Sequence, residues 1–152
     1  MSQESTDTYH GSCMCGAITY TIQGPLPEFG SCHCQTCQKA SGTAHGTNIG
    51  IARTQLTLSD PQGLLKGYES SPGKVRSFCG HCGTPIHAAL QANPDFVRMR
   101  IGSLDTPVSQ SVKAHSFVEE KAAWYEIGGR APQFSTWADP DVLVQLGSKQ
   151  PK

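Results

Sequence analysis

The chain has 152 residues with 12 basic and 12 acidic side chains, so its formal net charge at pH 7 is zero. This length suits one domain with its own hydrophobic core, and the balanced charge argues against a general footprint for nucleic acid or for an anionic membrane. Residues 1–10 lack the apolar run of a secretory signal, and no stretch approaches the roughly 20 apolar residues of a membrane span. We therefore expect a cytoplasmic protein without a nucleic-acid or membrane partner.

The first predicted strand covers residues 17–23, where β-branched and aromatic residues alternate with polar ones. Gly24 and Pro25 end this strand. A short extended piece follows over residues 30–34, and a short helix is expected over residues 34–41. Gly42 then suits the left-handed conformation that commonly ends a helix.

The rest of the chain is mostly strand-like, with turn residues between several of the runs. The expected strands cover residues 44–51, 55–58, 64–70, 74–79, 85–90, 96–101 and 114–118, and residues after Gly128 are expected to be irregular. Sixteen glycines and ten prolines, without a long helical periodicity, favour a mainly β fold of short strands. We expect a single domain over residues 11–140, between a loose N-terminal tail over 1–10 and an irregular C-terminal tail over 141–152.

Seven cysteines carry the strongest chemical signal in the chain. They are Cys13, Cys15, Cys32, Cys34, Cys37, Cys79 and Cys82. An odd number cannot all pair within one chain, and a reducing compartment disfavours disulfides. Offsets of two and three residues are metal-ligand spacings, which scattered core cysteines would not show. The redox alternative, a thioredoxin-like dithiol at the last pair, needs a βαβ pattern that the chain lacks.

Cys79 and Cys82 enclose two residues and are followed by Gly83, which is the form of a zinc knuckle. A knuckle supplies two ligands and a closed structural site needs four, so Cys13 and Cys15 can complete it. This division uses all seven cysteines as four plus three, and metal binding at the closed site would stabilise the fold. The alternative pairs the knuckle with two cysteines of the central group and leaves the first pair over.

The central group, Cys32, Cys34 and Cys37, has the spacing of an open zinc site. The first two cysteines would share one face of a strand, and the last two would share one face of a helical turn. A change from strand to helix at Cys34 would aim all three sulfurs at one point. Three thiolates leave one tetrahedral position for a substrate thiol, and they suit thiol binding better than hydroxide generation. The alternative is a closed site with His33, His45 or another side chain as fourth ligand.

Other side chains give weaker signals. The general acid–base candidates are His45, His87 and His115. His33 lies between two cysteines, so we expect its ring behind the ligands or at the surface. Arg98 and Arg100 alternate along a strand, where a solvated face is expected, and Trp124 and Tyr125 are expected in the core or a pocket wall.

Three segments resemble the family of glutathione-dependent formaldehyde-activating and centromere protein V-like proteins. They are Gly11-Ser12-Cys13-Met14-Cys15-Gly16-Ala17, Cys32-His33-Cys34-Gln35-Thr36-Cys37-Gln38-Lys39-Ala40-Ser41-Gly42 and Phe78-Cys79-Gly80-His81-Cys82-Gly83-Thr84. Weaker agreement comes from Gly102-Ser103-Leu104-Asp105 and from His115 with Glu120-Lys121-Ala122-Ala123-Trp124-Tyr125. The resemblance covers about residues 11–127.

The resemblance implies a β-tent-like fold of small antiparallel sheets with two zinc ions per chain. It places a structural zinc at Cys13, Cys15, Cys79 and Cys82, and a second, open and catalytic zinc at Cys32, Cys34 and Cys37. The implied activity is that of a carbon–sulfur lyase of the S-(hydroxymethyl)glutathione synthase type, which adds glutathione or a similar thiol to formaldehyde or a related small electrophile. No motif identifies a further catalytic residue. The alternative function is a non-enzymatic, zinc-stabilised module that binds a small molecule or a protein.

Overall fold

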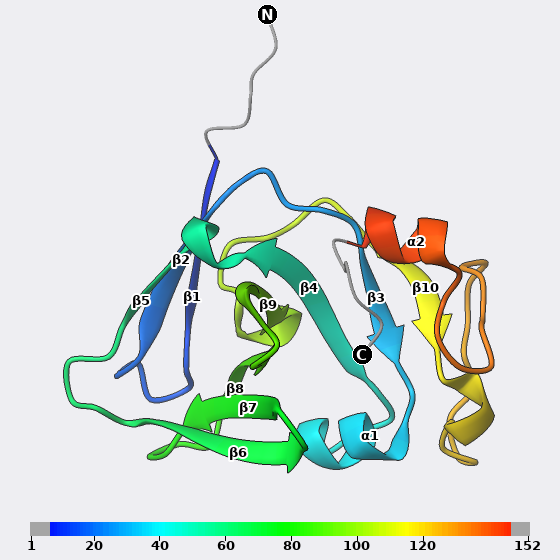
Figure 1. The fold of residues 1–152 in the computed structure, drawn as a ribbon, viewed down its shortest axis with the longest axis horizontal. Coiled ribbons are helices and arrows are strands. Elements are labelled where there is room, and N and C mark those ends of the chain that lie inside the picture. Colours follow the sequence, from blue (N-terminus) through cyan, green and yellow to red (C-terminus); the bar gives the residue numbers. More distant parts are fainter. Residues whose placement is uncertain (1–6, 147–152) are drawn as a thin grey trace, which may run out of the picture. The chain divides into compact units, whose positions relative to one another are not determined.

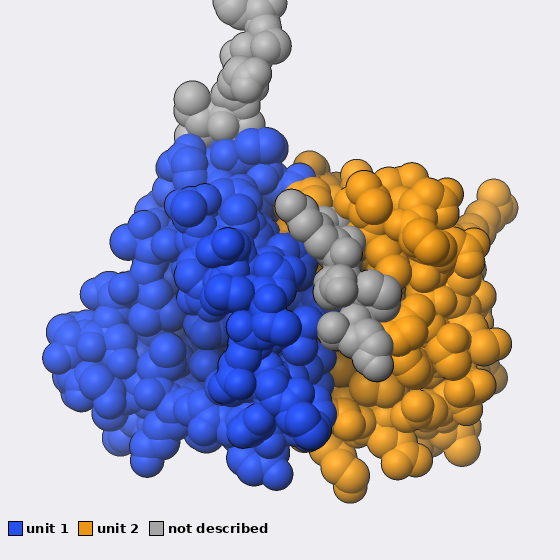
Figure 2. Space-filling model, in the orientation of Figure 1, with its two compact units in different colours: residues 1–26, 51–108 blue, residues 27–50, 109–152 orange. Residues whose placement is uncertain are grey.

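Short strands are the main regular structure of the fold (Figure 1), and the computed structural model describes residues 7–146. The chain divides into two compact units, each made of two separate segments (Figure 2). The first unit holds the residues up to Leu26 together with Ile51–Val108, and the second holds Pro27–Gly50 together with the residues from Ser109 onward.

The first unit contains a three-stranded sheet and a row of four further strands. In the three-stranded sheet, β2 lies between β1 and β5 and is antiparallel to both. In the row, β9, β8, β7 and β6 are neighbours in that order, and each is antiparallel to the next. The elements of this unit are β1 (Thr8–Ser12), β2 (Thr19–Gln23), η1 (Arg53–Gln55), β5 (Leu56–Ser59), β6 (Leu65–Ser71), β7 (Lys74–Cys79), β8 (Pro85–Leu90), β9 (Asn93–Arg100) and η2 (Ile101–Ser103).

Strand β2 shows why these segments are extended. Tyr20 and Ile22 are buried while Thr19 and Gln23 are exposed, so the side chains alternate between core and solvent with the period of a strand. The same alternation supplies the core of the first unit, whose most buried apolar side chains include Ile18, Tyr20, Ile22, Ile86, Val97 and Met99. Burial of this β-branched and aromatic surface is the main stabilising contribution.

The second unit is built around β3, which is antiparallel to β4 and parallel to β10. Its elements are β3 (Phe29–Cys32), α1 (Gln35–Ser41), β4 (Gly46–Ala52), β10 (Val112–Ser116), η3 (Val118–Glu120) and α2 (Pro140–Gln145). The last two residues of β4 belong to the first unit. None of the helices described between residues 7 and 146 is long and apolar enough to cross a membrane.

The mainly β fold class predicted from the sequence is confirmed, as is the helix that Gly42 ends with φ 75°. The β10–β3 pair differs from the expected antiparallel sheets because it is parallel. Residues 140–145 were expected to be irregular but form a helix, with Asp139 before it and Pro140 in its first turn, where a missing N–H costs nothing. Strand β1 starts at Thr8, inside the predicted tail, because residues 8–10 pair with residues 21–23.

The domain bounds inferred from the sequence stay a prediction. Residues 1–6 and 147–152 of the two predicted tails lie outside the described part of the chain.

The close approach of β1 to Tyr20 generates a stability prediction. A Cβ on Gly11 would overlap the Tyr20 ring, which is buried and whose hydroxyl lies 2.6 Å from Ser103 Oγ. We expect Gly11→Ala to lower the free energy of unfolding by about 1–3 kcal/mol, because the ring must shift and strain this hydrogen bond. Chemical denaturation measures the change. Gly102→Ala is the control, since a Cβ there meets nothing within 4 Å, and equal losses in both variants would contradict the overlap.

Candidate metal centres

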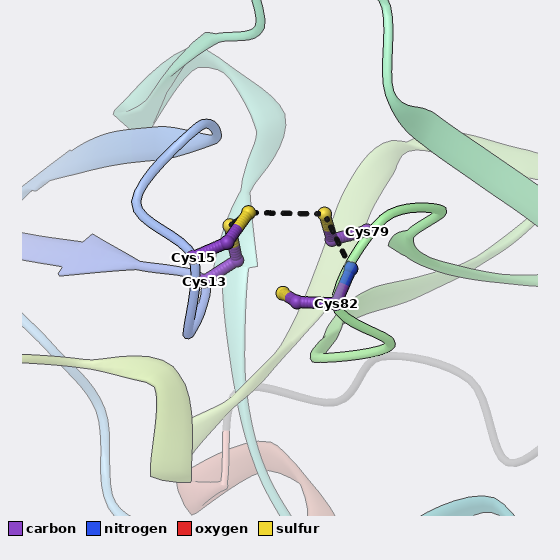
Figure 3. Close-up of side chains that lie close together, drawn as sticks. All are labelled: Cys13, Cys15, Cys79 and Cys82. Carbon is purple, nitrogen blue, oxygen red and sulfur yellow. Dashed lines mark hydrogen bonds between the residues drawn. The ribbon is translucent and has the colours of Figure 1, made fainter.

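Four cysteines of the first unit converge from two loops (Figure 3). Cys13 and Cys15 follow β1, Cys79 ends β7, and Cys82 lies in the turn before β8; their sulfurs all lie within 4.8 Å of one another. The Sγ–Sγ distance is 3.6 Å between Cys13 and Cys15, and 3.9 Å between Cys15 and Cys79. A tetrahedral zinc with Zn–S bonds of about 2.3 Å separates its ligand sulfurs by about 3.8 Å. The four thiols therefore fit one zinc ion.

The backbone of the second loop points its N–H groups at a sulfur. The N–H groups of His81 and Cys82 both donate to Cys79 Sγ at 3.4 Å. The turn closes through Gly83, whose φ of 83° is open to glycine at little cost and whose N–H donates to the Cys79 carbonyl at 2.8 Å. This loop has the geometry of the zinc knuckle that its sequence predicts.

Thr84 links the two loops of this cluster. Its hydroxyl oxygen accepts the Met14 N–H at 2.9 Å and lies 3.2 Å from Cys82 Sγ. The contact with the Thr84 side chain, together with backbone N–H groups of Thr84 and Cys15, lowers the pKa of the Cys82 thiol to about 5. Cys82 is therefore a thiolate at neutral pH, which is the form that binds a metal ion.

The central cysteines of the second unit meet at the junction of β3 and α1. Cys32 ends the strand, Cys34 is the N-cap of the helix, and Cys37 lies in the first helical turn. Cys34 keeps an extended backbone, with φ −68° and ψ 158°, and its sulfur accepts the Cys37 N–H at 3.3 Å. The three sulfurs lie within 4.8 Å of one another. The change from strand to helix at Cys34 is the one that the spacing predicts.

This three-sulfur cluster could hold a cation, which would offset the repulsion between three thiolates so close together. Hydrogen bonds with the Cys34 and Cys37 sulfurs, followed by burial, raise the pKa of the Cys32 thiol. Three thiolates at such short range are stable together only when a positive ion lies among them. Sulfur donors suit a soft ion such as zinc. His33 and His45, the alternative fourth ligands, are not members of the group whose ligand atoms lie within 4.8 Å of one another.

His33 is fully buried, so a surface position for its ring is wrong, and the expected place behind the ligands stays a prediction. Its Nε2 is 2.9 Å from His115 Nδ1, within hydrogen-bond distance. Burial, followed by the repulsion that a charged ring would meet from His115, His45 and Lys121, lowers the pKa of His33 to about 4. The ring is therefore neutral at pH 7 and does not compete with a metal ion for the thiolates.

His45 and Tyr125 flank His33. The His45 ring centroid is 5.1 Å from that of His33 and 5.5 Å from that of Tyr125. His45 Nδ1 is 3.2 Å from Thr47 Oγ1, which is 2.9 Å from Ser31 Oγ. The sequence analysis did not single out Ser31 and Thr47, although they are cross-strand partners in β3 and β4. Their spacing from Cys32 and His45 carries no local signal, because only the strand register brings them together.

The segment after β10 holds the start of α1. Glu120 accepts the Gln35 N–H on its side chain at 2.9 Å and a hydrogen bond from Gln38 Nε2 on its carbonyl at 2.9 Å. The same Gln38 amide donates to the His33 carbonyl at 2.9 Å. In the sequence, Gln38 and Glu120 stand out only as parts of longer motifs. The structure shows that their hydrogen bonds fix the backbone around Cys34.

Several predicted roles fall elsewhere. His87 lies in β8 of the first unit, whereas His45 and His115 lie in the second unit with the three-cysteine cluster. Arg100 is buried rather than solvated, because β9 turns its last residues into the core. Trp124 was expected in the core or in a pocket wall but is 71% exposed, while its neighbour Tyr125 is half-buried against His45.

Three comparisons place the chain among known proteins. A family model described as glutathione-dependent formaldehyde-activating enzyme matches residues 8–120. A Schizosaccharomyces pombe protein named an uncharacterized lyase is 32% identical over 92 residues, which are 59% of this chain and 64% of that protein, so less than two thirds of the relative is spanned. A crystal structure of a Rhodobacter sphaeroides protein superposes with a TM-score of 0.55 at 18% identity, over 66% of this chain and 91% of that chain. This structural likeness shows a shared fold.

Removing one cysteine ligand should affect folding differently in the two clusters. We expect Cys82→Ser to unfold much of the first unit, since its cluster joins loops 64 residues apart, between Cys15 and Cys79. We expect Cys34→Ser to keep the fold and to lose one zinc per chain, because its cluster lies on a single turn. Metal analysis, with two zinc ions expected in the wild-type chain, and circular dichroism measure both effects. If the two variants behave alike, the division into a closed and an open centre is wrong.

Proposed function

Because the chain belongs to the family of glutathione-dependent formaldehyde-activating enzymes, we propose that it is a zinc-dependent carbon–sulfur lyase. Its reaction is the addition of the thiol of glutathione, or of a similar small molecule, to formaldehyde or a related small electrophile. The observation that carries this proposal is the three-sulfur cluster of Cys32, Cys34 and Cys37. The relative that is named a lyase supports the reaction class.

The chemistry follows from the donor set of this cluster. A zinc ion held by three thiolates would leave one tetrahedral position for an incoming thiol and would favour its thiolate form at neutral pH. The substrate thiol loses its proton, its sulfur bonds to the carbonyl carbon, and the carbonyl oxygen gains a proton. Cys32 and Cys34 are half-buried whereas Cys37 is buried, so a substrate approaches from the side of the first two sulfurs.

The protein orients the three sulfurs before a substrate arrives. The Cys37 N–H fixes Cys34 Sγ, and Gln38 fixes the His33 carbonyl between Cys32 and Cys34. A prearranged site avoids the cost of ordering its ligands during the reaction. In the proposal the four-cysteine cluster binds a second, structural zinc, and the complete chain carries two zinc ions.

The partners in this proposal are small molecules. A neutral chain with thiol-rich sites fits a reducing compartment, so the proposal includes a cytoplasmic protein whose ligand is a thiol and not a nucleic acid or a membrane. The alternative function is that of a module that binds a small molecule or a protein without catalysing a reaction.

The test is the rate of S-hydroxymethylglutathione formation. We expect the zinc-loaded protein to exceed the uncatalysed rate in exchange NMR with formaldehyde and glutathione, and Cys34→Ser to abolish this acceleration while circular dichroism stays unchanged. Thr36→Ser is the matched control, because Thr36 is exposed on the same turn and should keep the rate. Calorimetric binding of glutathione without any acceleration would contradict the enzyme and favour a binding module.

A further inference from the structure

We propose that His45 is a catalytic residue, whose Nε2–H donates a hydrogen bond to the aldehyde oxygen as negative charge develops there. This inference rests on the proposed function and goes beyond it by choosing one histidine and one atom. The chain has six histidines, and the residue types alone do not distinguish them.

Position limits the choice to the second unit. His33, His45 and His115 lie in the unit that holds the three-cysteine cluster. The His45 ring centroid is 5.1 Å from that of His33, the residue between Cys32 and Cys34. The Cys37 charge also acts on the His45 ring, so His45 lies within electrostatic reach of the cluster at which the thiol is expected to bind.

Access and hydrogen bonding then separate the three rings. His33 is fully buried, with Nε2 next to His115 and with a buried Nδ1 that has no partner among the described residues. His115 is also buried, and its Nδ1 is engaged by His33. His45 is half-buried, and the hydrogen bond described for its ring uses Nδ1. Its Nε2 remains for a ligand.

The hydrogen-bond row behind His45 assigns its tautomer. Ser31 is buried, and the hydrogen bond described for its hydroxyl leads to Thr47 Oγ1 at 2.9 Å. A buried hydroxyl proton needs an acceptor, so Ser31 donates to Thr47. The Thr47 hydroxyl has one proton and donates it to His45 Nδ1 at 3.2 Å. The proton of the neutral His45 ring is thereby placed on Nε2.

The ring is suited to act as a neutral donor. Burial lowers the pKa of His45, against the opposing effect of the Cys37 charge, which favours the neutral ring at pH 7. A neutral imidazole held in one tautomer can polarise a carbonyl without giving up its proton. Donors of this kind act on the oxygen where charge develops in the transition state.

In the addition of the thiol to the aldehyde, atoms and electrons balance while His45 keeps its proton. The thiol proton passes to solvent, and the sulfur electron pair forms the S–C bond. The C–O π pair moves to the oxygen, which His45 stabilises through its Nε2–H, and the oxygen then takes a proton from water. No oxidant or reductant is needed.

Two amide substitutions test the atom as well as the residue. In His45→Gln the side-chain amide can replace the donor at the Nε2 position, whereas in His45→Asn the amide reaches only the Nδ1 position. With glutathione and formaldehyde, we expect kcat to fall about 100-fold or more in His45→Asn, as for a lost oxyanion donor, and about 10-fold or less in His45→Gln. If kcat falls equally and strongly in both variants, His45 transfers a proton and the donor role is overturned. If His45→Asn keeps the full wild-type kcat, His45 has no role in the reaction.

The tautomer gives a measurement that does not depend on activity. In zinc-loaded wild-type protein without substrate, the ¹⁵N chemical shifts of His45 should show a proton on Nε2 and none on Nδ1. Thr47→Val removes the hydroxyl that fixes this state and should give a mixture of tautomers. A proton on Nδ1 in the wild-type protein would overturn the assignment.

The two proposals fail in different ways. If the wild-type protein with two zinc ions bound does not accelerate the addition, the proposed function fails and the role of His45 fails with it. If the wild-type protein accelerates the reaction and His45→Asn does so equally, with the same zinc content, only the role of His45 fails.

Discussion

Repulsion between closely spaced thiolates is the constraint on which both units depend. Each unit holds one group of sulfurs within 4.8 Å of one another, and neither group can ionise fully without a cation. Much of the surrounding backbone serves to hold these sulfurs. In the first unit this is done by N–H groups that point at Cys79 and by the Thr84 hydroxyl, and in the second unit by the N-cap geometry of Cys34.

The two clusters differ in the length of chain that they join. The first brings Cys13 and Cys82 together, so a metal ion there would act as a crosslink between distant loops and would restrict the unfolded chain. The second lies within six residues and joins nothing distant. Its arrangement depends instead on β3, α1 and the segment around Glu120. Loss of a metal ion from the second cluster is therefore expected to disturb the fold less than loss of one from the first.

The sequence predicts those features that local spacing determines. The alternation of apolar and polar residues predicts the strands. The offsets of two and three residues between cysteines predict which cysteines form each cluster. What it missed depends on pairing between distant segments. The parallel pairing of β10 with β3 places His115 beside Ser31, and no local pattern indicates that register. Arg100 and Trp124 were misplaced for the same reason, since burial at a strand end or in a turn is decided by neighbours far along the chain.

The side-chain amide of Gln38 bonds two carbonyls at once, those of His33 and Glu120. One carbonyl lies between two cysteines of the cluster, and the other begins the turn that carries Tyr125. A molecule that displaces this turn must also stretch or tilt the amide, and through it the peptide bond beside Cys34. The peptide bond beside Cys34 and the backbone that leads to Tyr125 are thus tied to one another by a single side chain.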